Sequence, residues 1–490
     1  MGTIERSGLK PNDSVSPLRG RGNAITTETV FLLLFITGLA WIPFWLGSDR
    51  LTPWGINAVI FPCLAALYEL SLIIRGLPHP VAIRWIRSSA ILFAMAITWA
   101  LLQNATWTPT AWHHPVWQLA SEVLGRQIPE SISVDRDLTA LAVIRLMTAA
   151  SVFWLALQLG FNPRRARFLL WSVVGIVAVY AAVGLFALGL MQDDVVFDEI
   201  ILGHFVSSTF VNKNHFATFA GIGFTSIVAL IQRIYRGELH GHDLRSKIAS
   251  LLDTMGAKTA LPLAMAFLIL AALLLSGSRG GITSTGLCLL VLVVLSRRGA
   301  RRFGSNEMAL AVFMTLIVGG TFIGFGDRLV DRILNQGIND TGRLAADLIT
   351  IRSVLSAPIL GHGYGTFAAA FPMFRDDSMG VWVTWDKLHN TYLEIFQGLG
   401  LVFGTMLIVS VLLLVFRCMK GATSQQRDAT IPAVAVSVSV LVGVHALVDF
   451  SLQIQAITLT YMAVLGLGVA QATNTRLRPH PSVPRSDNGR

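Results

Sequence analysis

Charge is scarce in this chain. Of its 490 residues only 13% are Asp, Glu, Lys or Arg, while 53% are hydrophobic. A soluble domain carries about a quarter charged residues, so a water-soluble fold is excluded for most of the chain. The mean hydropathy of +0.62 indicates an integral membrane protein.

Cysteine is rare as well. Cys63, Cys288 and Cys418 each lie in or beside an apolar segment, and none has a partner at the spacing of metal ligands. A disulfide framework or a zinc site is therefore not expected. The net charge of +10 is typical of basic cytoplasmic loops in a membrane protein, so nucleic acid is not expected as a partner.

Long apolar runs, in contrast, fill the chain. A helix needs about 20 mostly apolar residues to cross a bilayer, and twelve stretches meet that requirement. The predicted fold class is all-α: a polytopic integral membrane bundle of about 12 transmembrane helices with a helical extracytoplasmic loop. The predicted spans are 28–47, 54–74, 86–103, 138–159, 168–190, 214–232, 259–276, 281–296, 307–325, 391–416, 429–448 and 455–472.

Lysine and arginine predict the orientation. They gather in alternate loops, and the alternation holds everywhere except in the long outer loop, as the positive-inside rule expects. Both termini are therefore predicted to be cytoplasmic. The predicted organisation is a disordered cytoplasmic tail (1–26), transmembrane helices 1–9 (27–325), a large periplasmic loop with an amphipathic helix (326–390), transmembrane helices 10–12 (391–472) and a cytoplasmic tail (473–490).

The large outer loop contains a helix signal. Asp340 or Thr341 can cap a helix, and Pro358 and Gly361 can end it. Apolar residues recur between them at i, i+4, i+7 and i+11, namely Leu344, Leu348, Ile351 and Leu355. This spacing predicts an amphipathic helix that lies on the membrane face or on the bundle. The glycine-rich turn 361–365 that follows is either a plain turn or a backbone that can approach phosphate.

A histidine stands where the loop meets the membrane. His389 precedes the predicted tenth span, next to Asn390, which could orient it or cap the helix. An imidazole with an ordinary pKa near 6.5 can exchange a proton at a working pH. His389 is thus a candidate for proton transfer, and an interfacial histidine without a chemical role is the alternative.

Several other charged residues are expected near the outer face. Arg279 lies in a very short turn between two spans, where its guanidinium suits phosphate oxygens or reaches for lipid headgroups. Arg145 lies within a span, where a charge indicates either function or a structural pair. Lys213 precedes another span. Asp449 lies four residues after His445, so the two are predicted to share a helix face.

Adjacent acids occur twice on the outer face, at Asp193 and Asp194 and at Asp376 and Asp377. A metal-dependent sugar transferase needs carboxylates that hold a divalent ion. Adjacent acids at a loop tip are more often solvated charges, so no metal site is predicted.

Four stretches resemble the O-antigen ligase/polymerase superfamily, which comprises lipopolysaccharide O-antigen ligases, Wzy-type polysaccharide polymerases and related pilin oligosaccharyltransferases. The stretches are 278–280, 341–344, 358–367 and 389–400. Two more, 210–216 and 445–450, are similar to segments of the polymerases. The chain departs from the family at Phe403, where a second glycine often follows the histidine motif.

The resemblance implies glycan transfer on the periplasmic face of a bacterial inner membrane, without a metal or another cofactor. The donor would be a glycan on undecaprenyl diphosphate, and the acceptor a sugar hydroxyl on another lipid-linked glycan or on lipid A core. His389 would act as general base, and Arg279 and Arg343 would bind the diphosphate. The second-rank candidates are Arg352, Lys213, Arg145 and Asp449. A chain-length regulator is an expected partner of a polymerase.

Other functions are compatible with twelve spans. A transporter or flippase of a lipid-linked or anionic substrate is the main alternative, and its charges should gather near mid-membrane. A shape-elongation glycosyltransferase of the peptidoglycan type would need an acidic outer-loop signature. A scaffold would need no clustered arginines. The sequence leaves polymerase and ligase open, with the stretches 210–216 and 445–450 favouring the polymerase.

Overall fold

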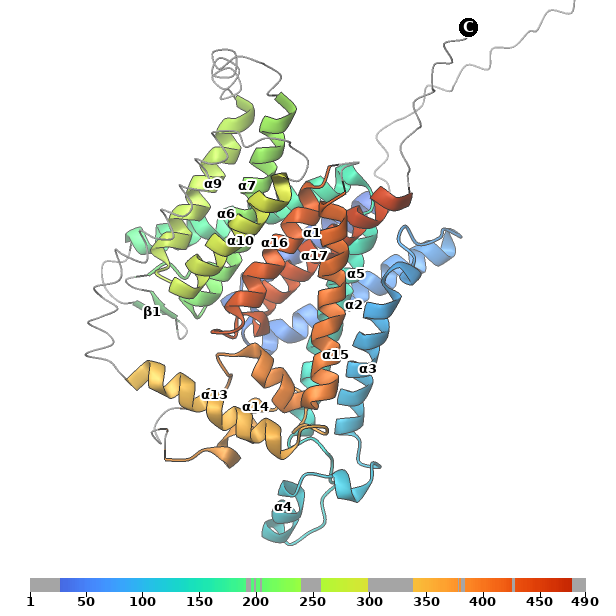
Figure 1. Ribbon diagram of the computed structural model, residues 1–490, viewed down its shortest axis with the longest axis vertical. Helices are drawn as coiled ribbons and strands as arrows, with labels where there is room; N and C mark the ends of the chain where they lie inside the picture. The colour runs from blue at the N-terminus through green and yellow to red at the C-terminus, as the bar shows by residue number, and fades with distance from the viewer. Residues whose placement is uncertain are drawn as a thin grey trace, which may run out of the picture.

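The computed structural model describes residues 27–190, 195–197, 200–202, 205–238, 257–297, 338–377, 379, 384–424 and 428–477. These residues form a bundle of helices that run largely along one direction (Figure 1). Within the described ranges, eight helices are long and apolar enough to cross a membrane, and three further apolar helices are shorter. A polytopic helical membrane protein is therefore confirmed, whereas the count of twelve spans stays a prediction.

The helices of the bundle are α1 (Thr27–Trp41), α2 (Leu51–Ile74), α3 (Arg87–Asn104), α5 (Arg136–Leu159), α6 (Pro163–Leu190), α7 (Lys213–Glu238), α9 (Ala257–Leu275), α10 (Arg279–Arg297), α15 (Thr391–Ala422), α16 (Thr430–His445) and α17 (Gln455–Leu477). Three helices lie in connections: α4 (Val116–Leu124), α13 (Ile338–Ser356) and α14 (Phe367–Ala370). Short 3-10 helices occupy Leu46–Ser48, Ile83–Ile86, Thr110–Trp112, Phe371–Phe374 and Ser451–Gln453.

Eleven of the twelve predicted spans coincide with a helix, and the ninth, 307–325, lies outside the described residues. Two details differ from the sequence prediction. The short strands β1 (Val195–Phe197) and β2 (Ile200–Leu202) pair antiparallel, so the chain is not wholly helical. Helix α16 ends at His445 rather than near 448, so Asp449 and His445 do not share a helix face.

Helix α17 forms the centre of the bundle. Of its most apolar window 83% is buried inside the protein, against 28% for α2 at the periphery. Small residues allow this close packing: a Cβ on Gly466 would lie 2.6 Å from the carbonyl oxygen of Phe153 in α5. Glycine thus lets two spanning helices approach backbone to backbone.

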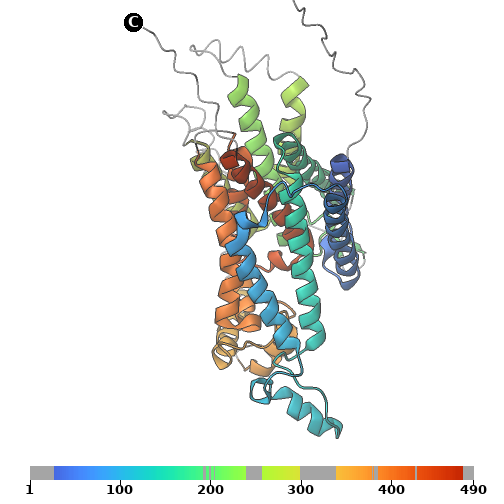
Figure 2. The ribbon, with the colours of Figure 1, turned by 90° about the vertical axis from the view of Figure 1, so that its right-hand side faces the viewer.

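One end of the bundle carries α4, α13 and α14, and we call it the loop end (Figures 1 and 2). It is the predicted periplasmic end. Helix α13 begins at Ile338, ahead of the predicted cap at Asp340 or Thr341, and ends at Ser356 before Pro358. Its buried face includes Ala346 and Ile349. The predicted apolar stripe is exposed instead, by 39% to 67%: Leu344, Leu348, Ile351 and Leu355.

Helix α15 is broken near its start. Gly400 has φ 75° and ψ 171°, so the segments 391–399 and 401–422 are two helical pieces. The turn 361–365 packs into this break, since the Gly363 amide donates to the Gly398 carbonyl and the Leu401 amide to the Pro358 carbonyl. Gln103 at the end of α3 also donates to the carbonyls of Gly398 and Leu360. The glycine-rich turn therefore stabilises the break in helix α15.

Substitution of Gly400 tests the break. A Cβ there would lie 2.3 Å from the carbonyl oxygen of Ile359, in a backbone conformation that costs other residues about 1–3 kcal/mol. We expect Gly400→Ala to lower the melting temperature of the detergent-solubilised protein by several degrees. Gly125→Ala is the control, because Gly125 also has positive φ but faces open space. Equal shifts in the two variants would show that the close packing contributes nothing.

Candidate functional site

His389 lies in a short loop whose backbone is held on both sides. Asn390 is the N-cap of α15, and its side chain accepts a hydrogen bond from the Leu393 amide at 3.3 Å, as the sequence predicts. On the other side, the Leu388 amide donates to Glu394 Oε2 at 2.9 Å. Leu388 itself is fully buried. The loop is thus fixed immediately before and after the histidine.

The imidazole of His389 lies between two aromatic side chains. Its ring centroid is 5.4 Å from that of Trp385 and 5.0 Å from that of Phe450, both with edge contacts. Burial, together with the positive charge of Arg343, lowers the pKa of His389 to about 4, whereas Asp449 acts in the opposite direction. At neutral pH the ring is therefore neutral and able to accept a proton.

A second histidine lies on the far side of Phe450. The His215 ring is 4.7 Å from the Phe450 ring, and its Nε2 is 3.6 Å from Asp449 Oδ2. His215 and Asp449 are each 1% exposed. A buried carboxylate therefore lies close to the aromatic cluster around His389, and the second-rank role of Asp449 stays a prediction.

Asp449 continues into a buried chain of polar groups. Ser451 Oγ donates to Asp449 Oδ2, and Thr218 Oγ1 bonds Ser451 Oγ at 3.1 Å and His445 Nδ1 at 2.6 Å. The chain ends beside the turn that carries Arg279, because a Cβ on Gly280 would lie 2.8 Å from His445 Nε2. The fold thereby brings the start of α10 into contact with the end of α16.

The side chains of Arg279 and Arg343 are both exposed, the first in the turn beside His445 and the second on α13. Neither forms a hydrogen bond or an ion pair with another residue in the described part of the chain. Arg343 lies close enough to His389 to affect its pKa, and its neighbour Gly342 approaches the Trp385 ring. The exposed guanidinium of Arg343, beside His389, is thus able to bind an anion.

Two of the second-rank candidates interact elsewhere. Arg352 Nη1 pairs with Asp376 Oδ2 at 2.5 Å, and its side chain is 64% exposed. Lys213 Nζ lies 3.2 Å from the centroid of the Phe205 ring. Asp193 and Asp194 lie outside the described residues. Within the described residues, no three His, Cys, Asp or Glu side chains are grouped to hold a metal ion.

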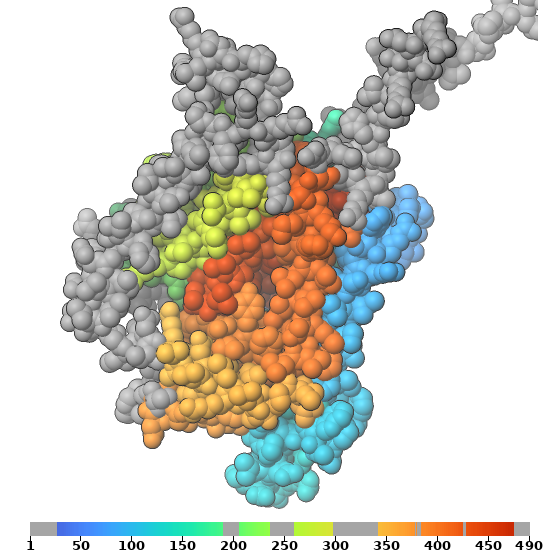
Figure 3. All heavy atoms as spheres, viewed as in Figure 1, coloured from blue at the N-terminus to red at the C-terminus, as the bar shows by residue number. Residues whose placement is uncertain are grey.

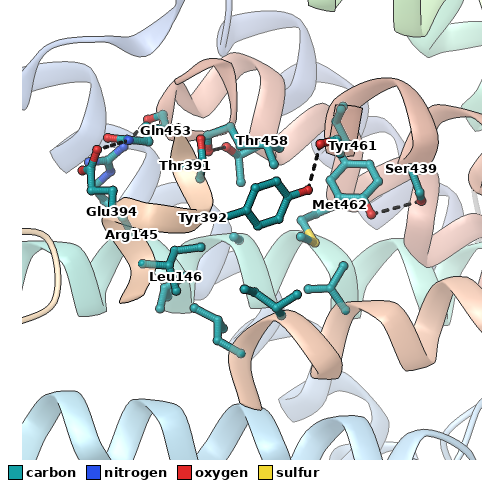
Figure 4. Close-up of a pocket in the computed structure, with 18 of the residues that line it drawn as sticks. Arg145, Leu146, Thr391, Tyr392, Glu394, Ser439, Gln453, Thr458, Tyr461 and Met462 are labelled. Atoms are coloured by element: carbon teal, nitrogen blue, oxygen red, sulfur yellow. Dashed lines mark hydrogen bonds between the residues drawn. The ribbon is translucent and has the colours of Figure 1, made fainter. Parts of the chain in front are cut away.

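Arg145 lines a pocket of about 340 Å³ among α5, α15, α16 and α17 (Figure 4). Most of its lining is aliphatic, including Leu146 on α5 and Leu412 on α15, and Leu412 is exposed on the outside of the bundle. Arg145, Glu394 and Gln453 lie together at one end. The pocket suits a hydrocarbon chain with a polar group at the charged end.

Three residues near the site were not singled out from the sequence. Asp49 lies 3.6 Å from Lys387 Nζ and thereby joins the loop of His389 to the segment after α1. Glu394 and Gln453 are joined through Gln453 Nε2 and Glu394 Oε2 at 2.7 Å. A carboxylate one turn into an apolar span is itself a signal of function, so Glu394 could have been found. Asp49 and Gln453 depend on contacts that a sequence pattern does not reveal.

A comparison with protein families finds a match to part of the chain. Residues 264–409, from α9 into α15, match the family model described as O-antigen ligase. This match supports the similarity of the chain to the O-antigen ligase/polymerase superfamily. The resemblance inferred from the motifs is confirmed, and the family indicates a membrane protein that acts in glycan transfer. A comparison with curated proteins finds no match.

The O-antigen ligase region contains Arg279, Arg343 and His389. His215, Arg145 and Asp449 lie outside it, although the fold packs their helices and turns around it. The loop end therefore combines superfamily residues with residues from the flanking helices.

Proposed function

We propose that this protein is a glycosyltransferase of the periplasmic face of the inner membrane. It transfers a glycan from undecaprenyl diphosphate to a sugar hydroxyl of a second lipid-linked glycan, and so polymerises a surface polysaccharide. The observation that carries the proposal is the neutral imidazole of His389 beside the exposed guanidinium of Arg343. A base and an anion-binding group are what this transfer needs.

In the proposed reaction the acceptor oxygen forms a bond to the anomeric carbon of the donor. The bond between that carbon and the diphosphate oxygen breaks, and His389 takes the proton of the acceptor hydroxyl. Arg279 and Arg343 stabilise the negative charge that grows on the leaving diphosphate. The step needs neither a metal nor another cofactor, since the leaving group is stabilised by the arginines.

The electrostatics of His389 suit this order of events. Arg343 helps to hold the pKa of His389 low while no anion is present. A diphosphate bound to Arg343 would offset that positive charge and raise the pKa of His389 toward the working pH. Donor binding would therefore make the imidazole a stronger base at the moment when it is needed.

The pocket beside the loop supports a lipid-linked donor. Its aliphatic body lies among spanning helices, and its polar end adjoins Glu394, which holds the loop of His389. A prenyl chain can occupy apolar space of this kind while its diphosphate stays at the loop end. The bilayer is then both the solvent of the protein and the source of its substrate.

Polymerisation, rather than ligation to lipid A core, is favoured by two stretches of the chain. Segments 210–216 and 445–450 resemble polymerases, and they meet at His215, Asp449 and Phe450, next to His389. A chain-length regulator is the partner that a polymerase of this superfamily would have.

The test is the size profile of surface polysaccharide in a strain that lacks the gene. A polymerase predicts collapse to single repeat units, with long chains restored by the wild-type gene. Loss of lipid A-linked polymer, with long lipid-linked chains accumulating, would instead identify a ligase. An unchanged profile would contradict glycan transfer and favour the transporter or flippase.

A further inference from the structure

Glu394 turns back toward the loop that precedes its own helix. Its Oε2 accepts one hydrogen bond from the Leu388 amide at 2.9 Å and another from Gln453 Nε2 at 2.7 Å. The first bond closes a ring of the chain around His389, because Leu388 and Glu394 lie on either side of it. The second ties this ring to the 3-10 helix Ser451–Gln453 that leads into α17.

Gln453 is in turn bonded to α5. Its carbonyl oxygen accepts a hydrogen bond from Arg145 Nη2, and the Arg145 guanidinium lies 4.2 Å from the centroid of the Trp54 ring. Figure 4 shows Arg145, Gln453 and Glu394 together at one end of the pocket. A continuous line of hydrogen bonds therefore runs from α5 through Gln453 and Glu394 to the backbone beside His389.

Within the described part of the chain, no residue orients the ring of His389 through a hydrogen bond to Nδ1. The Nδ1 atom itself is buried. Triad-type bases are commonly oriented by a third group that bonds the imidazole. Among the residues that the structure describes, the ring contacts of His389 are the edge contacts with Trp385 and Phe450, so the position of the imidazole depends on the backbone of the loop.

We infer that Glu394 is a positioning residue, which acts with Gln453 and Arg145 to hold the loop of His389 in place for proton transfer. The inference rests on the proposed function insofar as His389 is the base. A carboxylate suits this role for two reasons. One of its oxygens accepts both hydrogen bonds, and its negative charge offsets the positive charge of Arg145 inside the apolar pocket.

The experiment compares Glu394→Ala, Glu394→Gln and the control Tyr180→Phe. Tyr180 lies on α6, outside the lining of the pocket, and its hydroxyl donates to the Ala40 carbonyl at 2.9 Å. Glycan transfer is measured with lipid-linked glycan purified from the deletion strain. In parallel, the rate at which diethyl pyrocarbonate modifies His389 is followed by mass spectrometry, which reports the fixation of the loop without any turnover.

For Glu394→Ala we expect kcat to fall by about 100-fold, because misplacement of a reacting group by about 1 Å has that effect. KM should stay near the wild-type value, and His389 should be modified faster. Glu394→Gln should recover most of both properties, since its amide oxygen can still accept from the Leu388 amide. Tyr180→Phe should match the wild type in both measurements.

Unchanged kcat and unchanged modification of His389 in Glu394→Ala would overturn the inference. A failure of the proposed function is distinguishable, because His389→Ala would then keep full transfer while Glu394→Ala still accelerated the modification of His389 in the parallel measurement. If Glu394→Ala does not fold, Gln453→Leu removes only the second hydrogen bond and is judged by the same two measurements.

Discussion

Replacement of His389 by alanine is expected to lower kcat for glycan transfer by about 10²–10⁴-fold, the usual contribution of a general base. The acceptor hydroxyl would have no group to take its proton, while the arginines could still bind the donor. The measurement is transfer in proteoliposomes with lipid-linked glycan as both donor and acceptor. In the wild type, kcat/KM, which reports the pKa values of the free enzyme, should persist as the pH falls below 6.5, because burial lowers the pKa of His389 and the ring stays neutral.

The matched control for this prediction is His114→Ala. His114 lies in the loop between α3 and α5, and burial together with nearby His362 lowers its pKa to about 4 as well. It contacts the His362 ring rather than the cluster around His389. Near-normal transfer by His389→Ala would contradict the assignment of His389 as the general base. An equal loss of transfer in both variants would indicate that either substitution disturbs the outer loops as a whole.

The second large effect is expected at the guanidinium groups of Arg279 and Arg343. Arg279→Ala and Arg343→Ala should each lower kcat/KM by about 10²–10³-fold, in the range found when a donor to transition-state charge is removed. Lysine at either position should recover part of the loss, because it restores the charge without the planar fork. The measurement is the rate of transfer at low donor concentration, where kcat/KM is observed directly.

Arg352→Ala serves as the control for the arginine variants. Its side chain is largely exposed and pairs with Asp376, and an exposed ion pair contributes about 0–1 kcal/mol. Transfer should therefore stay close to normal. If Arg352→Ala lost as much transfer activity as Arg343→Ala, the activity would depend on α13 as a whole rather than on the guanidinium beside His389.

The spans were predictable because hydropathy and helix length are strongly coupled in a bilayer. The break at Gly400 was not, since a hydropathy window averages across it and glycine is common in spanning helices. Its conformation depends on the turn 361–365, which is about forty residues away in the sequence. The end of α16 and the short strands were missed as well. Local composition determines neither where a helix stops nor which short segments pair.

At the candidate site, the residues that lie in local motifs were predictable. Asn390 caps α15 as its position next to Thr391 suggests, and Arg279 lies at the start of α10 in a turn too short to hide it. Asp49 and Gln453 were not predictable, since each reaches the loop of His389 across a large sequence distance. The roles of His389, Arg279 and Arg343 stay predictions until the variants are measured.

The break at Gly400 divides one apolar helix into two pieces that can have different roles. Residues 401–422 extend about 33 Å at 1.5 Å per residue, which already matches the thickness of about 30 Å of the hydrocarbon layer. The preceding piece, 391–399, is therefore not needed as an anchor. It can instead carry His389 just before its first residue, while the turn 361–365 fixes its other end by hydrogen bonds. Figure 3 shows α13 and α15 adjacent on the visible face of the molecule, which is the contact this arrangement requires.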